Sequence, residues 1–185
     1  MKVEQTILND CFIIHDNVIT DQRGYFFESF NQQKFHQQTG LNISFVQDNQ
    51  SKSTKGVLRG MHYQLGEYSQ AKLVRVIEGA VLDIVVDIRP NSSTFGKSFS
   101  LELTANNNKQ LFVPRGFAHG FVVLSDTATF FYKCDNFYHK AAEGGFIYND
   151  ATLNLNWQLP TSAIILSEKD SVLPSFEEIK HTFKF

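Results

Sequence analysis

The sequence predicts an all-β protein, folded as an antiparallel barrel or sandwich with a few short helices. Period-two alternation of apolar and polar residues dominates the middle of the chain, which is typical of half-buried strands. Turn signals separate these runs at short, regular intervals, as they do in all-β folds. Aromatic residues make up 14% of the chain and include 18 Phe, and large rings at this density suit a packed interior.

The first predicted element is a helix over Asn31–Thr39. Phe30 and Phe35 are expected to face inward from it, and Gly40 is a suitable residue to end it. Near the other end of the chain, Ser175 and Glu178 have the spacing of a capping box, which predicts a short helix through His181. We expect helix to be scarce elsewhere.

Strands are predicted in close succession between these helices. In Val81–Ile88 one face is entirely apolar, whereas the other alternates valine with Asp83 and Asp87. Residues 99–104 alternate phenylalanine or leucine with polar residues in the same way. Further strands are expected at Ile43–Gln47, Val57–Tyr63, Leu73–Ile77, Leu111–Val113, Gly120–Leu124 and Thr129–Lys133. Many short strands at this spacing favour an antiparallel sandwich or barrel.

The composition bounds the classes of function. The 185 residues show no linker, repeat or composition break, so a single domain over 1–185 is expected. A net charge of −2 disfavours a nucleic-acid-binding surface. The first residues lack the apolar core of a signal peptide, and no stretch reaches transmembrane length, so we expect a cytoplasmic protein without a membrane partner. Cys11 and Cys134 are interpreted as reduced, buried side chains.

Two segments carry candidate chemistry. Gly56–Gln64 is a predicted strand that presents Arg59 and His62, and Pro114–His119 matches the Pro-x-Gly-x-x-His turn of cupin barrels. The second match predicts a cupin or jelly-roll form of the barrel. Metal-binding cupins use two histidines and a downstream glutamate in their first motif, which gives a cluster of nitrogen and oxygen ligands. Here Gln64 stands where the second histidine is needed, so we expect no metal.

A barrel without a metal can still remove a proton next to a carbonyl group. This chemistry needs a base, a donor that stabilises the developing oxyanion, and an acid on the opposite face. Histidine suits the role of base because it titrates near physiological pH, which makes His62 a candidate. Lys72, at the start of a predicted strand, is a candidate oxyanion donor. Tyr132 lies in an apolar run and is either the acid or a core residue.

A series of short segments shares its order and spacing with one enzyme family. The segments are Asp21–Phe30, Phe45–Ser51, Lys55–Gln64, Lys72–Val74, Asp83–Arg89, Thr94–Gly96, Pro114–Phe121, Trp157 and Leu166–Asp170. Together they resemble the dTDP-4-dehydrorhamnose 3,5-epimerases, over a span from about Cys11 to Asp170. So many matches in the right order are far more specific than any one motif.

The resemblance implies a reaction and roles for four residues. The reaction is cofactor-free epimerisation at C3 and C5 of dTDP-4-dehydro-6-deoxy-D-glucose, which gives dTDP-4-dehydro-L-rhamnose on the route to dTDP-L-rhamnose, a cell-envelope sugar. His62 is implied as the general base, with Asp170 orienting its ring. Lys72 is implied to face the C4 oxygen, and Tyr132 to return a proton from the opposite face.

The resemblance also implies how the substrate is held. Arginines offer forked donors to a diphosphate, and an aromatic ring, either Phe26 or Tyr138, stacks on the thymine. The family forms homodimers in which an N-terminal strand reaches across, so Arg23 and Glu28 are expected to serve the partner's pocket. The implied binding residues are Arg23, Phe26, Glu28, Gln47, Asn49, Arg59, Lys72, His119, Tyr138, Glu143 and Lys169.

Three other functions compete with this interpretation. A related enzyme on the same sugar, either a 3- or 5-monoepimerase or a 3,4-ketoisomerase, shares the base and the nucleotide residues. A non-catalytic nucleotide-sugar-binding cupin has no need of a paired base and acid, so the combination of His62 and Tyr132 argues against it. A metal-dependent cupin oxygenase is disfavoured by Gln64.

Overall fold

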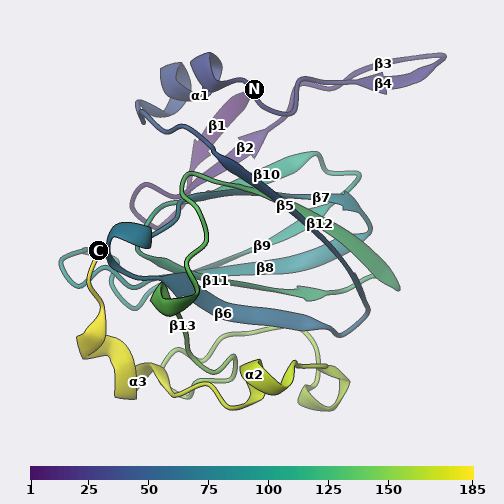
Figure 1. Cartoon of the computed structure of the whole chain (residues 1–185). Coiled ribbons are helices and arrows are strands. Elements are labelled where there is room, and N and C mark those ends of the chain that lie inside the picture. Colours follow the sequence, from purple (N-terminus) through teal and green to yellow (C-terminus); the bar gives the residue numbers. More distant parts are fainter.

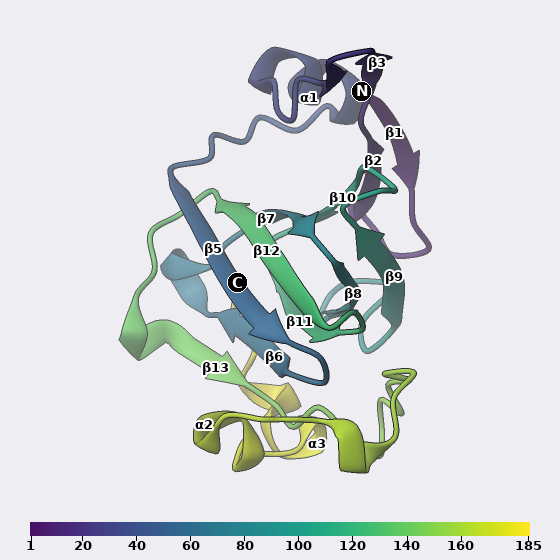
Figure 2. The ribbon, with the colours of Figure 1, turned by 90° about the vertical axis from the view of Figure 1, so that its right-hand side faces the viewer.

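The computed structural model describes residues 1–185 and contains two antiparallel sheets that face each other (Figure 1). A two-stranded hairpin, β3 (Ile19–Asp21) with β4 (Gly24–Phe26), projects from this body. Figure 2 looks along the space that the two sheets enclose. The prediction of an all-β, cupin-like barrel with a few short helices is therefore confirmed.

Both sheets combine strands that are distant in the sequence. The six-stranded sheet has the order β1 (Lys2–Gln5), β2 (Phe12–His15), β10 (Lys109–Val113), β7 (Lys72–Glu78), β12 (Thr127–Cys134), β5 (Gln47–Thr54). The five-stranded sheet has the order β13 (Glu143–Gly145), β6 (Leu58–Gln64), β11 (Phe117–Val123), β8 (Ala80–Asp87), β9 (Ser98–Thr104). With one exception, each predicted strand is present with small shifts of its ends.

The exception is the predicted strand Ile43–Gln47, which is wrong. Its apolar residues Ile43 and Phe45 are not in a sheet but pack against an apolar cluster that includes Phe35 of the helix α1 (Gln32–Thr39). The strand β5 begins only at Gln47, and its exposure alternates although its residues are almost all polar. One face of β5 lines a polar cavity and the other meets solvent, so apolar alternation is missing from its sequence.

The helices are short and lie outside the sheets. They are α1 (Gln32–Thr39), α2 (Glu168–Ser171) and α3 (Phe176–Ile179), with 3-10 turns at Gly66–Tyr68, Lys140–Ala142, Thr161–Ala163 and Lys180–Thr182. The side chain of Asn31 caps the start of α1, and Gly40 caps its end, as the sequence predicts. Ser175 and Glu178 form the predicted capping box of α3. None of the helices has the length and the hydropathy needed to span a membrane.

Three apolar clusters hold the layers together. The cluster inside the barrel includes Val76, Val85 and Phe121, which come from both sheets. A second cluster joins the outer face of the five-stranded sheet to the C-terminal segment, where Trp157 and Phe176 are buried. This segment, with α2 and α3, crosses below β6 in Figures 1 and 2. The five-stranded sheet is therefore covered on both faces.

The third cluster lies on the opposite side of the molecule. There Phe35 of α1 packs against Leu73 and Phe112 on the outer face of the six-stranded sheet. Phe30 is only partly buried, but it packs against the same cluster, so both predicted inward residues contribute to it. α1 thus anchors the chain between the projecting hairpin and β5.

The strand β8 shows how sequence alternation becomes two buried faces. Leu82 and Ile84 point outward into the C-terminal layer, whereas Val81 and Val85 point into the barrel. Because successive strand residues point to opposite faces, Asp83 shares the interior face with these valines. A carboxylate is therefore placed in the middle of the barrel, with 0% of its surface exposed.

Candidate active site

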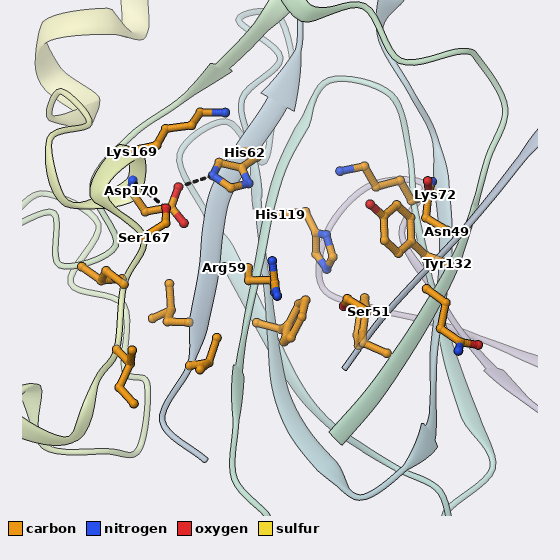
Figure 3. Close-up of a pocket in the computed structure, with 17 residues that line it drawn as sticks. Asn49, Ser51, Arg59, His62, Lys72, His119, Tyr132, Ser167, Lys169 and Asp170 are labelled. Carbon is orange, nitrogen blue, oxygen red and sulfur yellow. Dashed lines mark hydrogen bonds and ion pairs between the residues drawn. The ribbon is translucent and has the colours of Figure 1, made fainter. Parts of the chain in front are cut away.

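A cavity of about 510 Å³ opens into the barrel between the two sheets. Its wall combines residues of both sheets with residues of the C-terminal segment, as Figure 3 shows. Eight residues that the resemblance implies for the site line this cavity: Asn49, Arg59, His62, Lys72, His119, Tyr132, Lys169 and Asp170. The fold thus gathers residues that are separated by most of the chain.

An extra residue in β6 lets Arg59 and His62 share the cavity. Strict alternation puts residues three apart on opposite faces of a strand. In the pairing with β11, however, His62 is opposite His119 and Arg59 is opposite Phe121, so β6 carries one residue more than its partner. Gly60 provides this irregularity, with φ of 144° and no room for a Cβ, which would lie 2.5 Å from the Gly120 Cα.

His62 forms a hydrogen-bonded pair with Asp170. Its Nε2 lies 2.6 Å from Oδ1 of the carboxylate, and the Asp170 side chain is only 5% exposed. The Ser167 hydroxyl caps α2 by accepting a hydrogen bond from the Asp170 N–H, which fixes the carboxylate. Burial alone disfavours the charge on Asp170, but the hydrogen bonds from His62 and Ser167 outweigh it and hold its pKa below the ordinary value.

Lys72 and Tyr132 face this pair from the opposite wall (Figure 3). They come from β7 and β12 of the six-stranded sheet, whereas His62 comes from β6 of the five-stranded sheet. The Lys72 ammonium lies 5.9 Å from the centre of the Tyr132 ring. Burial lowers the pKa of Lys72 and raises the pKa of Tyr132. The phenol of Tyr132 is therefore held in its protonated form, whereas burial opposes the charge on the Lys72 amine beside it.

His119 lies between these walls and has its own carboxylate partner. Its Nε2 is 2.8 Å from Oδ2 of Asp83 on the neighbouring strand β8. The His119 side chain is 8% exposed and that of Asp83 is 0% exposed. The His119 ring also stacks on Phe130, with centroids 6.0 Å apart. The cavity is thus lined by two histidine–carboxylate pairs.

A smaller cavity of about 160 Å³ adjoins the first and shares His62, Lys72 and Tyr132 with it. It is lined by three further residues that the resemblance implies for substrate binding, namely Gln47, Tyr138 and Glu143. Glu143 accepts hydrogen bonds from the Tyr138 hydroxyl at 2.9 Å and from Lys169 at 2.6 Å. Burial opposes the charge on Glu143, but these two bonds keep its pKa below the ordinary value.

The remaining implied residues, Arg23, Phe26 and Glu28, do not line either cavity. Arg23 and Phe26 belong to the projecting hairpin; the Arg23 side chain is 85% exposed and Phe26 is 70% exposed. Glu28 follows the hairpin and pairs with Lys34 of α1 on the surface. Within one chain, the structure does not bring these residues to the site.

Two residues of the site were missed by the sequence reasoning. Asp83 is part of a predicted strand and of a matched segment but has no predicted role in the site, although a carboxylate among inward-facing valines is a signal. Ser53 was not singled out, yet its hydroxyl accepts two hydrogen bonds from the Arg59 guanidinium, each 3.2 Å long. These contacts depend on strand register, which the sequence does not reveal.

Taken together, the side chains can move protons across the cavity. An imidazole on one wall can accept a proton from a bound molecule, and a phenol on the other wall can return one. Lys72 supplies positive charge for an oxyanion that forms in between. Such an arrangement suits the inversion of a carbon next to a carbonyl group.

Comparison with known proteins supports the same kind of chemistry. The sequence model of a family described as dTDP-4-dehydrorhamnose 3,5-epimerase matches residues 5–178. The chain is 50% identical to the dTDP-4-dehydrorhamnose 3,5-epimerase of Escherichia coli (strain K12) over 97% of its length and 96% of that protein's.

Solved structures are similar over equally long spans. One is the dTDP-4-dehydrorhamnose 3,5-epimerase of Elizabethkingia anophelis NUHP1, with 56% identity, a TM-score of 0.93 and coverage of 96% of this chain and 97% of that chain. Another is the dTDP-6-deoxy-D-glucose-3,5-epimerase of Legionella pneumophila Philadelphia 1 in complex with dTDP-4-keto-L-rhamnose. Its identity is 40% and its TM-score 0.94, with coverage of 100% of this chain and 98% of that chain.

Proposed function

This chain belongs to the dTDP-4-dehydrorhamnose 3,5-epimerase family, and we propose that His62 and Tyr132 carry out its reaction from opposite walls of the barrel. The chain is an isomerase of the dTDP-L-rhamnose route, which epimerises C3 and C5 of dTDP-4-dehydro-6-deoxy-D-glucose to give dTDP-4-dehydro-L-rhamnose. One observation carries the assignment of roles. The imidazole and the phenol come from different sheets and face each other across a single cavity.

Each inversion begins with a proton removed from a carbon next to the C4 ketone. His62 takes this proton, and Asp170 holds the ring in place and stabilises its positive charge. The electrons move toward the C4 oxygen, where Lys72 balances the negative charge. Tyr132 then gives a proton to the opposite face of the same carbon, and its raised pKa keeps it protonated until that step. His62 then releases its proton to solvent and Tyr132 regains one from solvent, and repetition at the second carbon completes the double epimerisation.

The nucleotide is held beside the sugar. Arg59, supported by Ser53, offers a fork of donors to the diphosphate. Tyr138, which is 51% exposed and lines the smaller cavity, is proposed to stack on the thymine, with Phe26 as the alternative. The other binding residues proposed within this chain are Gln47, Asn49, Lys72, His119, Glu143 and Lys169.

We further propose that the protein works as a homodimer. The hairpin exposes Ile19, Tyr25 and Phe26 to 60–70% and projects from the body that the two sheets form (Figure 1). An apolar arm of this kind is suited to a second copy of the chain. Arg23 and Phe26, with Glu28 behind them, would then complete the pocket of the neighbouring protomer. We expect the whole of 1–185 to act as one epimerase domain in the cytoplasm, without a cofactor.

NMR of the purified protein with its dTDP-4-keto sugar in deuterated water tests this function. We expect deuterium at both C3 and C5 and formation of the L-rhamno product. Deuterium at only one of the two carbons would instead identify a monoepimerase, and migration of the keto group a ketoisomerase. Binding of the sugar without any exchange would identify a non-catalytic cupin.

A further inference from the structure

The second histidine–carboxylate pair, His119 with Asp83, has no part in the proton transfers described above. It is built like the first pair, because in both the imidazole uses Nε2 to meet a carboxylate oxygen. The strand register also links the two pairs, since His119 on β11 is directly opposite His62 on β6. Its carboxylate comes from β8, deep in the barrel.

Asp83 is not explained by packing. Its neighbours on the interior face of β8 are valines, and an apolar residue would fill the same position without the cost of burying a charge. One carboxylate oxygen, Oδ1, is sealed from solvent and has no hydrogen-bond partner, so the barrel satisfies this group only in part. A buried carboxylate kept under these conditions points to a role toward its one partner, His119.

The contact decides which nitrogen of His119 carries the proton. A carboxylate can only accept hydrogen bonds, so Nε2 must be the protonated nitrogen in this contact. Nδ1 is then the unprotonated nitrogen of the neutral ring. Nδ1 has no hydrogen-bond partner within the chain. Because this atom is also not sealed from solvent, it is open to the cavity.

We propose that Asp83 is a positioning residue that sets the tautomer of His119, so that Nδ1 accepts a hydrogen bond from a hydroxyl group of the bound sugar. The proposal rests on the proposed function, which places the sugar in this cavity. The other charged or titratable groups that line the cavity near the His119 ring are Arg59, His62, Lys72 and Tyr132. Arg59, Lys72 and Tyr132 donate hydrogen bonds, and the free nitrogen of His62 is taken up by its proposed role as base, so an unprotonated Nδ1 of His119 supplies the acceptor that a sugar hydroxyl needs.

Lys72 and His119 then have different roles toward the sugar. Lys72 remains the cation for the C4 oxygen, while His119 recognises a hydroxyl and holds the ring between base and acid. In the wrong tautomer, His119 would present an N–H to that hydroxyl and the hydrogen bond would be lost. The consequence is misplacement of the reacting carbon, which reduces catalysis more than nucleotide binding.

The substitution Asp83→Asn tests the proposal with little change of shape. An amide can donate as well as accept, so it permits the ring to change its tautomer. We expect kcat to fall about 10²-fold, in line with the loss of orienting carboxylates elsewhere, while the affinity for dTDP alone stays unchanged. Nitrogen-15 NMR at pH 8 should show His119 of the wild-type protein protonated at Nε2. In the variant the signal should move toward protonation at Nδ1.

Asp87→Asn is a matched control, because Asp87 lies on the same strand and is also 0% exposed but pairs with Arg89 outside the cavity. This variant should leave kcat and the His119 signals unchanged. A normal kcat in Asp83→Asn, or a wild-type His119 protonated at Nδ1, overturns the proposal. If Asp83→Asn does not fold, the wild-type spectrum alone tests the proposal. The His119 signals in it are identified by their loss in His119→Asn. That spectrum reports the His119 tautomer without any turnover, so it tests this proposal independently of the exchange assay that tests the proposed function.

Discussion

Nε2 of His62 lies 2.6 Å from Oδ1 of Asp170, although 108 positions separate the two residues in the chain. Asp170 reaches the barrel because the C-terminal segment runs along the outer edge of β6, where Ile165 bridges to Val57. Gly56 allows this approach, since a Cβ at its position would lie 2.1 Å from the carbonyl oxygen of Ala163. The proposed base, His62, therefore gains its carboxylate partner only when the C-terminal layer is packed.

The first prediction concerns this pair. His62→Ala should lower the rate of deuterium exchange at both C3 and C5 by about 10²–10⁴-fold, because general-base catalysis typically contributes that much. Asp170→Asn should lower it as well, since an amide does not stabilise the imidazolium. The measurement is the NMR exchange rate under saturating substrate.

His15→Ala serves as the control for that experiment. His15 also pairs with a carboxylate, that of Glu4 at 2.8 Å, but on the outer part of the six-stranded sheet. It should leave the exchange rates unchanged. Exchange near the wild-type rate in His62→Ala would show that another group removes the protons.

The second prediction concerns the alkaline limb of the pH profile. Burial lowers the pKa of Lys72, so with rising pH the ammonium loses its charge before an ordinary lysine does, near 10.4. Because the proposed mechanism uses the charged form of Lys72 to stabilise the oxyanion, kcat should fall through this lowered pKa. Tyr132, whose pKa is raised, keeps its proton to higher pH. In Lys72→Arg, which stays charged, the residual activity should lack this limb; a limb of unchanged position would assign it to another group.

The third prediction concerns acid stability away from the site. Asp87 accepts hydrogen bonds from Arg89, Ser92 and Thr94, and these outweigh the effect of burial and hold its pKa below the ordinary value. A lowered pKa contributes stability that is full above about pH 4 and is lost as the pH falls through the folded-state value. Asp87→Asn should therefore destabilise the protein by about 1–3 kcal/mol at pH 7, because Arg89 keeps Asp10 as a partner. The difference in Tm from the wild type should shrink between pH 5 and pH 2, and a constant difference would contradict this account.

The fourth prediction is that catalysis needs no metal ion. Gln64 occupies the position of a cupin metal ligand, and both ends of its amide are engaged, with the carbonyl oxygen of Tyr68 and the N–H of His139. His62 and His119 each use one ring nitrogen for a carboxylate. Dialysis against EDTA should therefore leave kcat unchanged. Loss of activity that a divalent ion restores would overturn the prediction.

Much of the barrel could be predicted from alternation alone. The strand β9 alternates apolar with polar residues, and β8 has one wholly apolar face and one that mixes valine with aspartate, so both strands are predicted from the sequence. β5 was misplaced because its inward face lines a polar cavity, so its sequence looks like a loop. The N-terminal strands β1 and β2 were not predicted, since four residues are too short for a clear pattern.

The sequence predicts the site residues that belong to matched motifs. It does not predict the contacts that depend on how the strands are paired. The residues brought to the cavity by the matched segments, such as His62 and Tyr132, lie together. The pairing of His119 with Asp83 needed the register of β8 and β11, which only the folded sheet specifies. The role proposed for Arg23 needs a second copy of the chain, because within one chain its guanidinium contacts only the neighbouring Asp21 on the hairpin.

Tyr132→Phe tests most directly whether base and acid work from opposite walls. The change removes the hydroxyl and nearly preserves the ring, which packs beside Phe130 on the inner face of β12. Incubated with the dTDP-4-keto sugar in deuterated water, this variant should still introduce deuterium through His62 but form little inverted product. Its affinity for dTDP should equal that of the wild type. Epimerisation at the normal rate would contradict the account, because Tyr132 would then be a core residue and the acid would have to be another group.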